Sequence, residues 1–212
     1  MKIGIIGAGK IGSTAARLFT KAGHEVALSN SRGPESLRGV VAELGPKAHA
    51  MSVDDAAKFG DVVLLAIPWR TPEALPSQAT VKAKIVIDAM NAYTASGGHE
   101  RLDPSTSSSE ETLKRLPGAR LVKAFNTIWF RHLAERGRTD APVGERHAIF
   151  FAGDDAEAKR VVSRLIEEIG FAPVDTGSLH DGGRRQEPNT PLYNQVLTGI
   201  EGHKIAGRPI SA

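Results

Sequence analysis

Residues 2–12 read Lys-Ile-Gly-Ile-Ile-Gly-Ala-Gly-Lys-Ile-Gly, an apolar run that leads into the spacing Gly-x-Gly-x-x-Gly. Residues 13–23 continue as an amphipathic helix that ends at Gly23. A strand that turns through such glycines into a helix is typical of dinucleotide sites, because bare backbone and free helical N–H groups accept a pyrophosphate. We therefore predict a dinucleotide-binding corner built on Gly7, Gly9 and Gly12.

The second predicted strand, residues 25–28, indicates which dinucleotide binds. A site for NAD usually ends this strand with an acidic residue on the ribose, whereas a site for NADP carries an arginine for the 2′-phosphate. Here the strand leads into Ser29-Asn30-Ser31-Arg32, and no carboxylate follows before Glu35. Ser31 offers a hydroxyl and Arg32 a forked, charged donor, so NADP(H) is the predicted cofactor, although Arg32 could also be a solvated surface charge.

Composition narrows the class of protein. The chain has 212 residues, 41% of them hydrophobic, which is enough for one large α/β domain or two small ones. It has no cysteine, which excludes disulfides, thiolate zinc sites and cysteine nucleophiles, and its seven histidines show no metal-spaced pair, so no metal site is predicted. No apolar stretch is long enough for a membrane span and no signal peptide is evident, so we expect a cytoplasmic protein without a membrane partner.

The net charge of the chain indicates what kind of partner it binds. The net charge is +3, yet only 5% of residues are aromatic and no basic run is interleaved with aromatic residues, which argues against nucleic acid. A small anionic or flavin-like molecule explains a basic surface better.

Strands and helices alternate along the whole chain, which predicts a doubly wound Rossmann fold of the α/β class, with a mostly parallel sheet and helices on both faces. We expect one domain, with a dinucleotide-binding core over residues 1–118 and a small C-terminal α/β extension over residues 119–212 that completes the substrate crevice. Residues 95–109 are rich in serine and glycine and predict a mobile surface loop. Residues 182–191 predict an irregular segment before a last helix over 192–206, and this segment is either a surface connection or a substrate clamp. A short helix is predicted over 71–79.

Ligands of open α/β sheets bind beyond the carboxyl ends of the strands. Three predicted strand ends, Ile67-Pro68-Trp69, residues 88–92 and Asn126-Thr127-Ile128, should therefore surround the nicotinamide and the ring stacked on it. Trp69 forms either an apolar wall for the substrate or part of the core, and these two interpretations stay equally open. The residues predicted to face the nicotinamide or the substrate at these ends are Ile67, Pro68, Trp69, Asn91, Asn126 and Thr127.

Two classes of dehydrogenase are excluded by the sequence, which limits the reactions that the protein can catalyse. A short-chain dehydrogenase needs a lysine four residues after its tyrosine, but Tyr93 and Tyr193 are followed at that spacing by Gly97 and Leu197. A hydroxyacid dehydrogenase of the 6-phosphogluconate type needs a long helical second domain, and only roughly forty residues follow the last predicted strand. No catalytic acid is evident, which favours an acceptor such as a flavin or deazaflavin that requires hydride placement above all.

The chain resembles the NADPH:coenzyme F420 oxidoreductase family in its glycine turn, in Ser31-Arg32, in Ile67-Pro68-Trp69, in Gly153-Asp154-Asp155 and in the helix end at 165–170. Residues 123–128 also resemble a segment of the reductase domain of the STEAP metalloreductases. The resemblance implies reversible hydride transfer between C4 of the nicotinamide and C5 of the deazaflavin. It also implies that Gly9, Lys10, Ile11 and Gly12 hold the pyrophosphate, that Ser31 and Arg32 hold the 2′-phosphate, and that Ile67, Pro68, Asn91 and Asn126 lie near the nicotinamide.

Three functions stay open at this point. The chain is an NADPH-dependent reductase of deazaflavin F420, a reductase of another acceptor such as a flavin or a ferric chelate, or a non-catalytic NADP(H) sensor. A homodimer is expected because the predicted last helix carries five large apolar residues, Leu192, Val196, Leu197, Ile200 and Ile205.

Overall fold

The computed structural model describes residues 1–100 and 102–207. The strands of this part form one sheet in the order β3-β2-β1-β4-β5-β6-β7-β8. Neighbouring strands are parallel except β6 and β7, which run antiparallel, so the prediction of a mostly parallel α/β sheet is confirmed. The strands are β1 (Lys2–Ile6), β2 (Glu25–Ser29), β3 (Ala48–Ala50), β4 (Val62–Leu65), β5 (Ile85–Asp88), β6 (Arg120–Ala124), β7 (Ala148–Gly153) and β8 (Ala172–Gly177).

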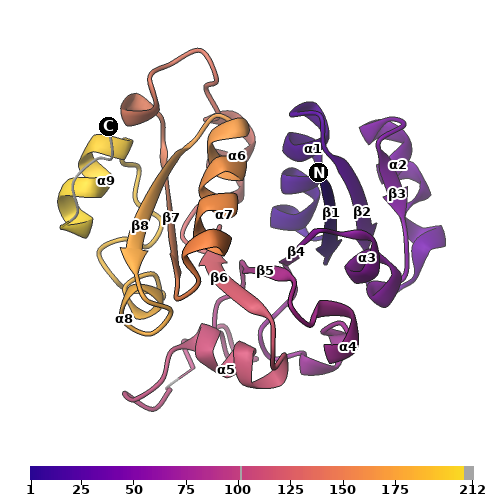
Figure 1. Cartoon of the computed structure of the whole chain (residues 1–212), viewed down its shortest axis with the longest axis horizontal. Helices are drawn as coiled ribbons and strands as arrows, with labels where there is room; N and C mark the ends of the chain where they lie inside the picture. Colours follow the sequence, from indigo (N-terminus) through magenta and orange to yellow (C-terminus); the bar gives the residue numbers. More distant parts are fainter. Residues whose placement is uncertain (101, 208–212) are drawn as a thin grey trace.

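Side chains of a strand alternate between the two faces of the sheet. Helices cover both faces, so the strands are buried on both sides. One face packs against α1, α6 and α7, and the other packs against α3, α4 and α5 (Figure 1). At the β7–β8 end, α9 covers a smaller apolar cluster. The helices are α1 (Lys10–Lys21), α2 (Arg38–Leu44), α3 (Val53–Phe59), α4 (Gln78–Val81), α5 (Ser108–Arg115), α6 (Phe130–Glu135), α7 (Ala156–Glu168), α8 (Asp181–Arg184) and α9 (Gly199–Ala206).

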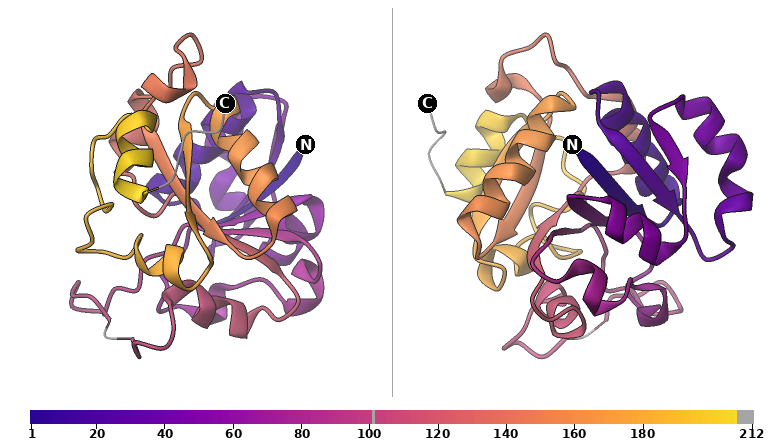
Figure 2. Two further views of the ribbon diagram at one scale, coloured as in Figure 1. Left: turned by 60° about the vertical axis from the view of Figure 1, so that its left-hand side comes forward. Right: turned by 45° about the vertical axis from the view of Figure 1, so that its right-hand side comes forward.

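The two halves of the chain lie side by side around the centre of the sheet. Figure 2 shows the indigo N-terminal elements next to the orange and yellow C-terminal elements, with the segments around α4 and α5 at one end of the molecule. β5 and β6 pair directly, so the sheet continues across the expected division at residue 118. No helix in the described ranges combines the length and apolarity that a membrane span requires.

The prediction of a mobile serine-rich loop over residues 95–109 is wrong for its last residues. Residues 107–109 are buried, and α5 begins at Ser108. Ser107 forms a capping box with Glu110, in which each side chain binds the other residue's backbone N–H. The serine hydroxyls find buried partners, so their polarity does not keep this segment at the surface. Residues 95–100 are exposed, as expected of a surface loop.

Two predicted helices are also corrected. The helix over 71–79 is instead a short 3₁₀ turn, Pro72–Ala74, followed by α4, because Pro76 interrupts the run. The last helix begins at Gly199 rather than at residue 192, since Thr198 caps it in a second capping box with Glu201. Residues 182–191 are not a plain surface connection: they include the end of α8, and Gln186 is fully buried.

Candidate dinucleotide and acceptor site

The glycine turn between β1 and α1 is shaped for a close anion. Gly7 has a φ of +111°, and a Cβ on it would come within 2.4 Å of the Ala66 carbonyl oxygen. A Cβ on Gly12 would meet the Gly7 oxygen at 1.8 Å, so both glycines are required by packing. Around Gly9, by contrast, a Cβ would meet nothing within 4 Å. α1 starts there without a side-chain cap and without an acidic residue in its first turn, which leaves its N–H groups for a pyrophosphate.

A cleft of about 620 Å³ extends from this turn. It brings together six of the residues that the sequence assigned to the cofactor, which come from the ends of β1, β2 and β4: Gly7, Gly9, Ser31, Arg32, Ile67 and Pro68. The strand order places this cleft where β1 meets β4. This is the switch point at which Rossmann sheets bind dinucleotides.

The loop after β2 holds Arg32 free for this cleft. The Asn30 side-chain oxygen accepts the Arg32 backbone N–H at 2.9 Å, and the Asn30 amide donates to Ser36 at 2.9 Å. The next carboxylate, Glu35, pairs with Arg38 at 2.5 Å. The Arg32 side chain is exposed and lines the cleft, so a phosphate there would meet a guanidinium that this carboxylate does not occupy.

Three predicted pyrophosphate residues do not line the cleft with their side chains. Lys10 is exposed, and its ammonium lies 4.5 Å from the centre of the Phe130 ring. Ile11 packs against the main core cluster, and Gly12 is buried against Gly7. Contact with a phosphate can therefore come only from their backbone N–H groups and from a rotated Lys10.

The ends of β5 and β6 meet through two asparagines. Asn91 donates its amide to the Asn126 carbonyl at 2.9 Å, and the Asn126 amide donates to the Asn91 side-chain oxygen at 3.1 Å. The Asn126 amide also donates to the Gln186 carbonyl at 2.8 Å. The C-terminal segment therefore reaches the predicted crevice. Asn194 extends this contact by donating its backbone N–H to the Thr127 carbonyl at 2.8 Å.

Trp69 and Thr127, the two predicted substrate residues, have different environments. Trp69 is half-buried, donates its indole N–H to the Ser108 carbonyl at 3.1 Å, and lies under the Arg115 guanidinium at 5.0 Å from the ring centre. It therefore packs on α5 and keeps part of its surface in solvent. Thr127 is only 3% exposed, so its contact with a substrate stays a prediction.

Sequence reasoning missed two further aromatic features near the strand ends. Trp129 follows Asn126 by three residues and is 42% exposed. Its position directly after a strand end is a local signal that could have identified it. The Tyr93 and Tyr193 hydroxyls lie 2.7 Å apart, and burial raises the pKa of Tyr193 above its ordinary value. No local pattern connects these two residues, because 100 positions separate them.

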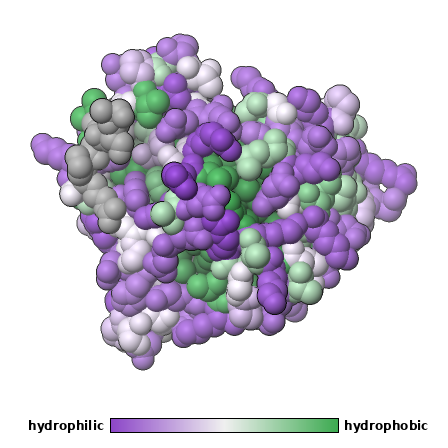
Figure 3. Space-filling model, in the orientation of Figure 1, coloured by the Kyte–Doolittle hydropathy of each residue, from purple (hydrophilic) through white to green (hydrophobic). Residues whose placement is uncertain are grey.

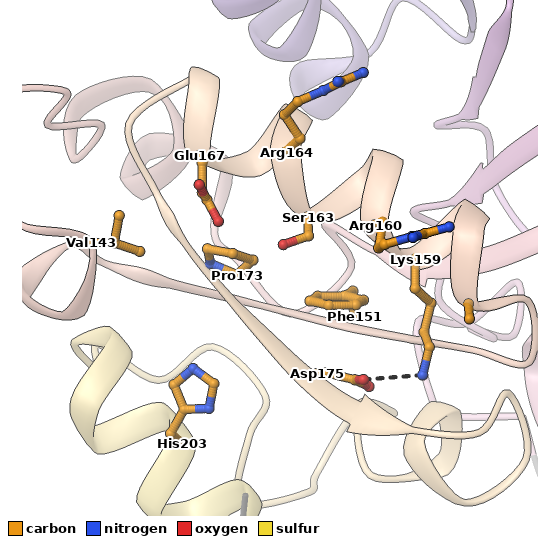
Figure 4. A pocket seen from close by; sticks show the side chains of 11 residues that line it. Val143, Phe151, Lys159, Arg160, Ser163, Arg164, Glu167, Pro173, Asp175 and His203 are labelled. Carbon is orange, nitrogen blue, oxygen red and sulfur yellow. Dashed lines mark hydrogen bonds and ion pairs between the residues drawn. The ribbon is translucent and has the colours of Figure 1, made fainter. Parts of the chain in front are cut away.

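A larger hollow of about 690 Å³ lies elsewhere, between α7, β8 and the residue His203 of α9 (Figure 4). Lys159 and Asp175 form an ion pair at 3.0 Å at one side of it, and Phe151 and Pro173 also line it. β8 is the last strand of the sheet, with four strands between it and β1, so this hollow is separate from the glycine turn. Figure 3 shows a mostly hydrophilic face on which apolar side chains are visible chiefly in hollows near the centre.

The fold and the cleft define a dinucleotide-binding α/β protein. A family model described as "NADP oxidoreductase coenzyme F420-dependent" matches residues 2–92. The F420-dependent NADP reductase of Methanocaldococcus jannaschii is 32% identical over 160 residues, which cover 69% of each chain. A solved structure of a hypothetical protein from Sinorhizobium meliloti is 35% identical, with a TM-score of 0.80 over 93% of this chain and 95% of that chain.

Metalloreductase STEAP3 of Rattus norvegicus is 30% identical over 181 residues, which make up 84% of this chain and 34% of that protein. The chain thus spans about a third of the length of this relative. The chain belongs to the family of coenzyme F420-dependent NADP oxidoreductases. The expected resemblance is confirmed, and the expectation of an NADP(H) cofactor is confirmed with it.

Proposed function

We propose that the protein transfers a hydride between NADP(H) and the deazaflavin coenzyme F420. The observation that carries this proposal is the joining of two adjacent strand ends through Asn91 and Asn126, at the same sheet edge as the glycine turn and the Ser31–Arg32 loop. The 32% identity to an F420-dependent NADP reductase supports deazaflavin as the acceptor. The net charge of +3 also favours an acceptor that carries a phosphate and glutamates.

When bound, NADPH supplies a hydride from C4 of its nicotinamide. The residues of the chain bind NADPH and orient its nicotinamide. Ser31 and Arg32 hold the 2′-phosphate, while the first N–H groups of α1 hold the pyrophosphate. Ile67 and Pro68 present a rigid apolar edge at the inner end of the cleft.

Orientation at the reacting end comes from the paired asparagines. Each amide is held by the other strand end, so neither side chain is free to rotate, and the pair fixes the ends of β5 and β6 relative to each other. The chain supplies proximity and alignment of two rings rather than a proton, and alignment alone accounts for large rate effects in such reactions.

A flavin or a ferric chelate is the alternative acceptor. It is favoured by the 30% identity to STEAP3 over 181 residues, a protein that its name describes as a metalloreductase. Membership in an oxidoreductase family weighs against the third possibility, a non-catalytic NADP(H) sensor.

An acceptor screen tests the proposal. Oxidation of NADPH is followed at 340 nm with F420, with FMN or FAD, and with ferric citrate, each at matched concentration. We expect turnover with F420 at least tenfold faster than with the other acceptors. Oxidation only with flavin or ferric citrate would support the alternative, and tight NADPH binding without oxidation by any acceptor would support a sensor.

A further inference from the structure

We propose that Lys123, buried beneath the strand ends, is a positioning residue that sets the geometry of the acceptor crevice through the first turn of α5. This inference rests on the proposed hydride transfer at the strand ends. Lys123 lies on β6 and has no exposed surface, and its register partner on β5, Asp88, is equally buried. The proposed contacts with the cofactor do not use either residue.

All three ammonium protons of Lys123 have an acceptor. The Nζ atom donates to the Met90 carbonyl at 3.2 Å, to the Ser108 hydroxyl at 3.2 Å and to the Ser109 hydroxyl at 3.1 Å. The Ser109 hydroxyl in turn donates to Asp88 Oδ2 at 2.6 Å, and that oxygen lies 3.8 Å from Nζ. Ser109 therefore bridges the two buried charges.

The acceptors connect Lys123 to two neighbouring segments, the end of β5 and the first turn of α5. Met90 precedes Asn91, one of the paired asparagines, and its backbone N–H also binds Asp88 at 2.9 Å. The Ser108 carbonyl accepts the indole N–H of Trp69, which comes from the end of β4. The Ser108 backbone N–H donates to Glu187 at 2.9 Å.

Glu187 completes the set of contacts, because it follows Gln186, whose carbonyl accepts the Asn126 amide. Lys123 and the first turn of α5 thus connect all three strand ends and the C-terminal segment. A buried ion pair of this kind adds little stability over a well-packed apolar pair. Its distinctive contribution is geometric, because an ammonium with three fixed acceptors holds β6 at set distances from the end of β5 and from the first turn of α5.

Lys84 provides a matched control. Its ammonium also donates to three oxygens, the carbonyls of Ala57, Lys58 and Gly60, at 2.7–2.8 Å. It precedes β5, however, and so lies at the end of that strand opposite to Asn91. Loss of either lysine removes three hydrogen bonds, but only Lys123 bonds to Met90 and to the first turn of α5, next to the strand ends.

The experiment compares Lys123→Met with Lys84→Met. We expect Lys123→Met to lower kcat with F420 at least tenfold while the Kd of NADPH changes by less than about threefold, since a displacement of roughly 1 Å at a reacting centre has large kinetic effects. Lys84→Met should lower the melting temperature and keep kcat within twofold. A Lys123→Met variant that is folded and retains kcat within twofold would overturn the proposal, as would an equal loss of kcat in both variants.

Two further measurements keep the test decisive. If Lys123→Met does not fold, Ser109→Ala removes only the bridging hydroxyl and should lower kcat threefold or more with an unchanged NADPH Kd; unchanged kcat would overturn the proposal. If the wild-type protein does not oxidise NADPH with F420, the proposed function fails separately. The emission of bound NADPH, and of Trp69 in a Trp129→Phe background, should then still change with Lys123→Met and not with Lys84→Met. Identical spectra for both variants would overturn the positioning role.

Discussion

Phe125 adopts a φ of +66° although its side chain is fully buried. A left-handed conformation costs a non-glycine residue on the order of 1 kcal/mol, and it persists only where the surroundings impose it. The Phe125 ring packs edge-on against Phe19 of α1, with ring centres 6.2 Å apart. This turn ends β6 abruptly and directs the next residue, Asn126, to Asn91. Strain at one residue therefore accompanies the joining of the two strand ends.

Arg32 carries the prediction on cofactor choice. We expect the wild-type protein to bind NADPH more tightly than NADH by about 2–3 kcal/mol, the value of a charge-assisted pair. Arg32→Ala should remove most of this difference, which titration of both nucleotides measures. Arg38→Ala is the control, since Arg38 is exposed nearby but pairs with Glu35 and does not line the cleft. Equal affinities of the wild-type protein for the two nucleotides would contradict the prediction.

Trp69 carries a second prediction at this scale. Trp69→Ala should lower turnover while NADPH affinity stays within about threefold, because the phosphate contacts lie elsewhere. The loss of stability should be about 1–3 kcal/mol, below the roughly 3–5 kcal/mol of a fully buried tryptophan, since Trp69 is only partly buried. Steady-state kinetics, NADPH titration and urea unfolding on this variant test both parts. Unchanged turnover with a large loss of stability would show that Trp69 serves the core alone.

At the scale of elements, α6, β7 and the strand that follows it meet in a cluster of rings. His147 precedes β7 and is 8% exposed, with its ring 5.7 Å from His132 and 6.2 Å from Phe171. Burial, together with the nearby His132 and Arg136, lowers the pKa of His147 to about 4. This cluster joins the segment after the strand ends to the C-terminal half of the sheet, so its protonation affects the stability of that junction.

The pH dependence of folding follows from this pKa. The folded-state pKa of about 4 lies below the ordinary value of 6.5, so the unfolded chain binds the proton more readily. The contribution of His147 is thus fully present above pH 6.5 and is lost as the pH falls toward 4, by about 2 kcal/mol at pH 5. Urea unfolding at pH 7 and pH 5 should show a smaller loss in His147→Gln than in the wild-type protein. An identical loss in both would refute the role of His147.

At the scale of the whole molecule, α9 covers the β7–β8 end of the sheet but leaves apolar side chains in solvent. Ile200 is 53% exposed, Val196 is 51% exposed and Ile205 is 43% exposed, while Leu192 and part of Leu197 are buried in the local cluster. Val143 adds a further exposed apolar side chain, and its neighbour Gly144 lies against Ile200. Clusters of this kind mark interaction surfaces.

We therefore expect the protein to form a symmetric dimer through α9. Ile200→Glu should give a monomer, because it places a charge at the centre of an apolar contact. Light scattering at micromolar concentration measures both states, and the melting temperature of the variant shows whether the fold is retained. A monomeric mass of the wild-type protein under these conditions would rule out the dimer.

Local sequence predicts the parts of the protein whose structure depends on residues that are close together in the chain. The glycine turn, the Ser31–Arg32 loop and the apolar strands each depend on a few consecutive residues, so their patterns predict the Rossmann fold and its NADP(H) site. The capping box at Ser107 and Glu110 is also local, and its Ser-x-x-Glu spacing was a readable signal within a segment predicted as a loop.

Only the tertiary structure determined what surrounds the acceptor crevice. The partners of Lys123 on α5 precede it by 14 and 15 residues, Trp69 reaches Ser108 across 39, and Tyr93 reaches Tyr193 across 100. No spacing rule connects such positions, because their hydrogen bonds form only after the sheet brings the strand ends together. A buried lysine and buried serines also look like surface residues in sequence, since their polarity is compensated by partners that folding supplies.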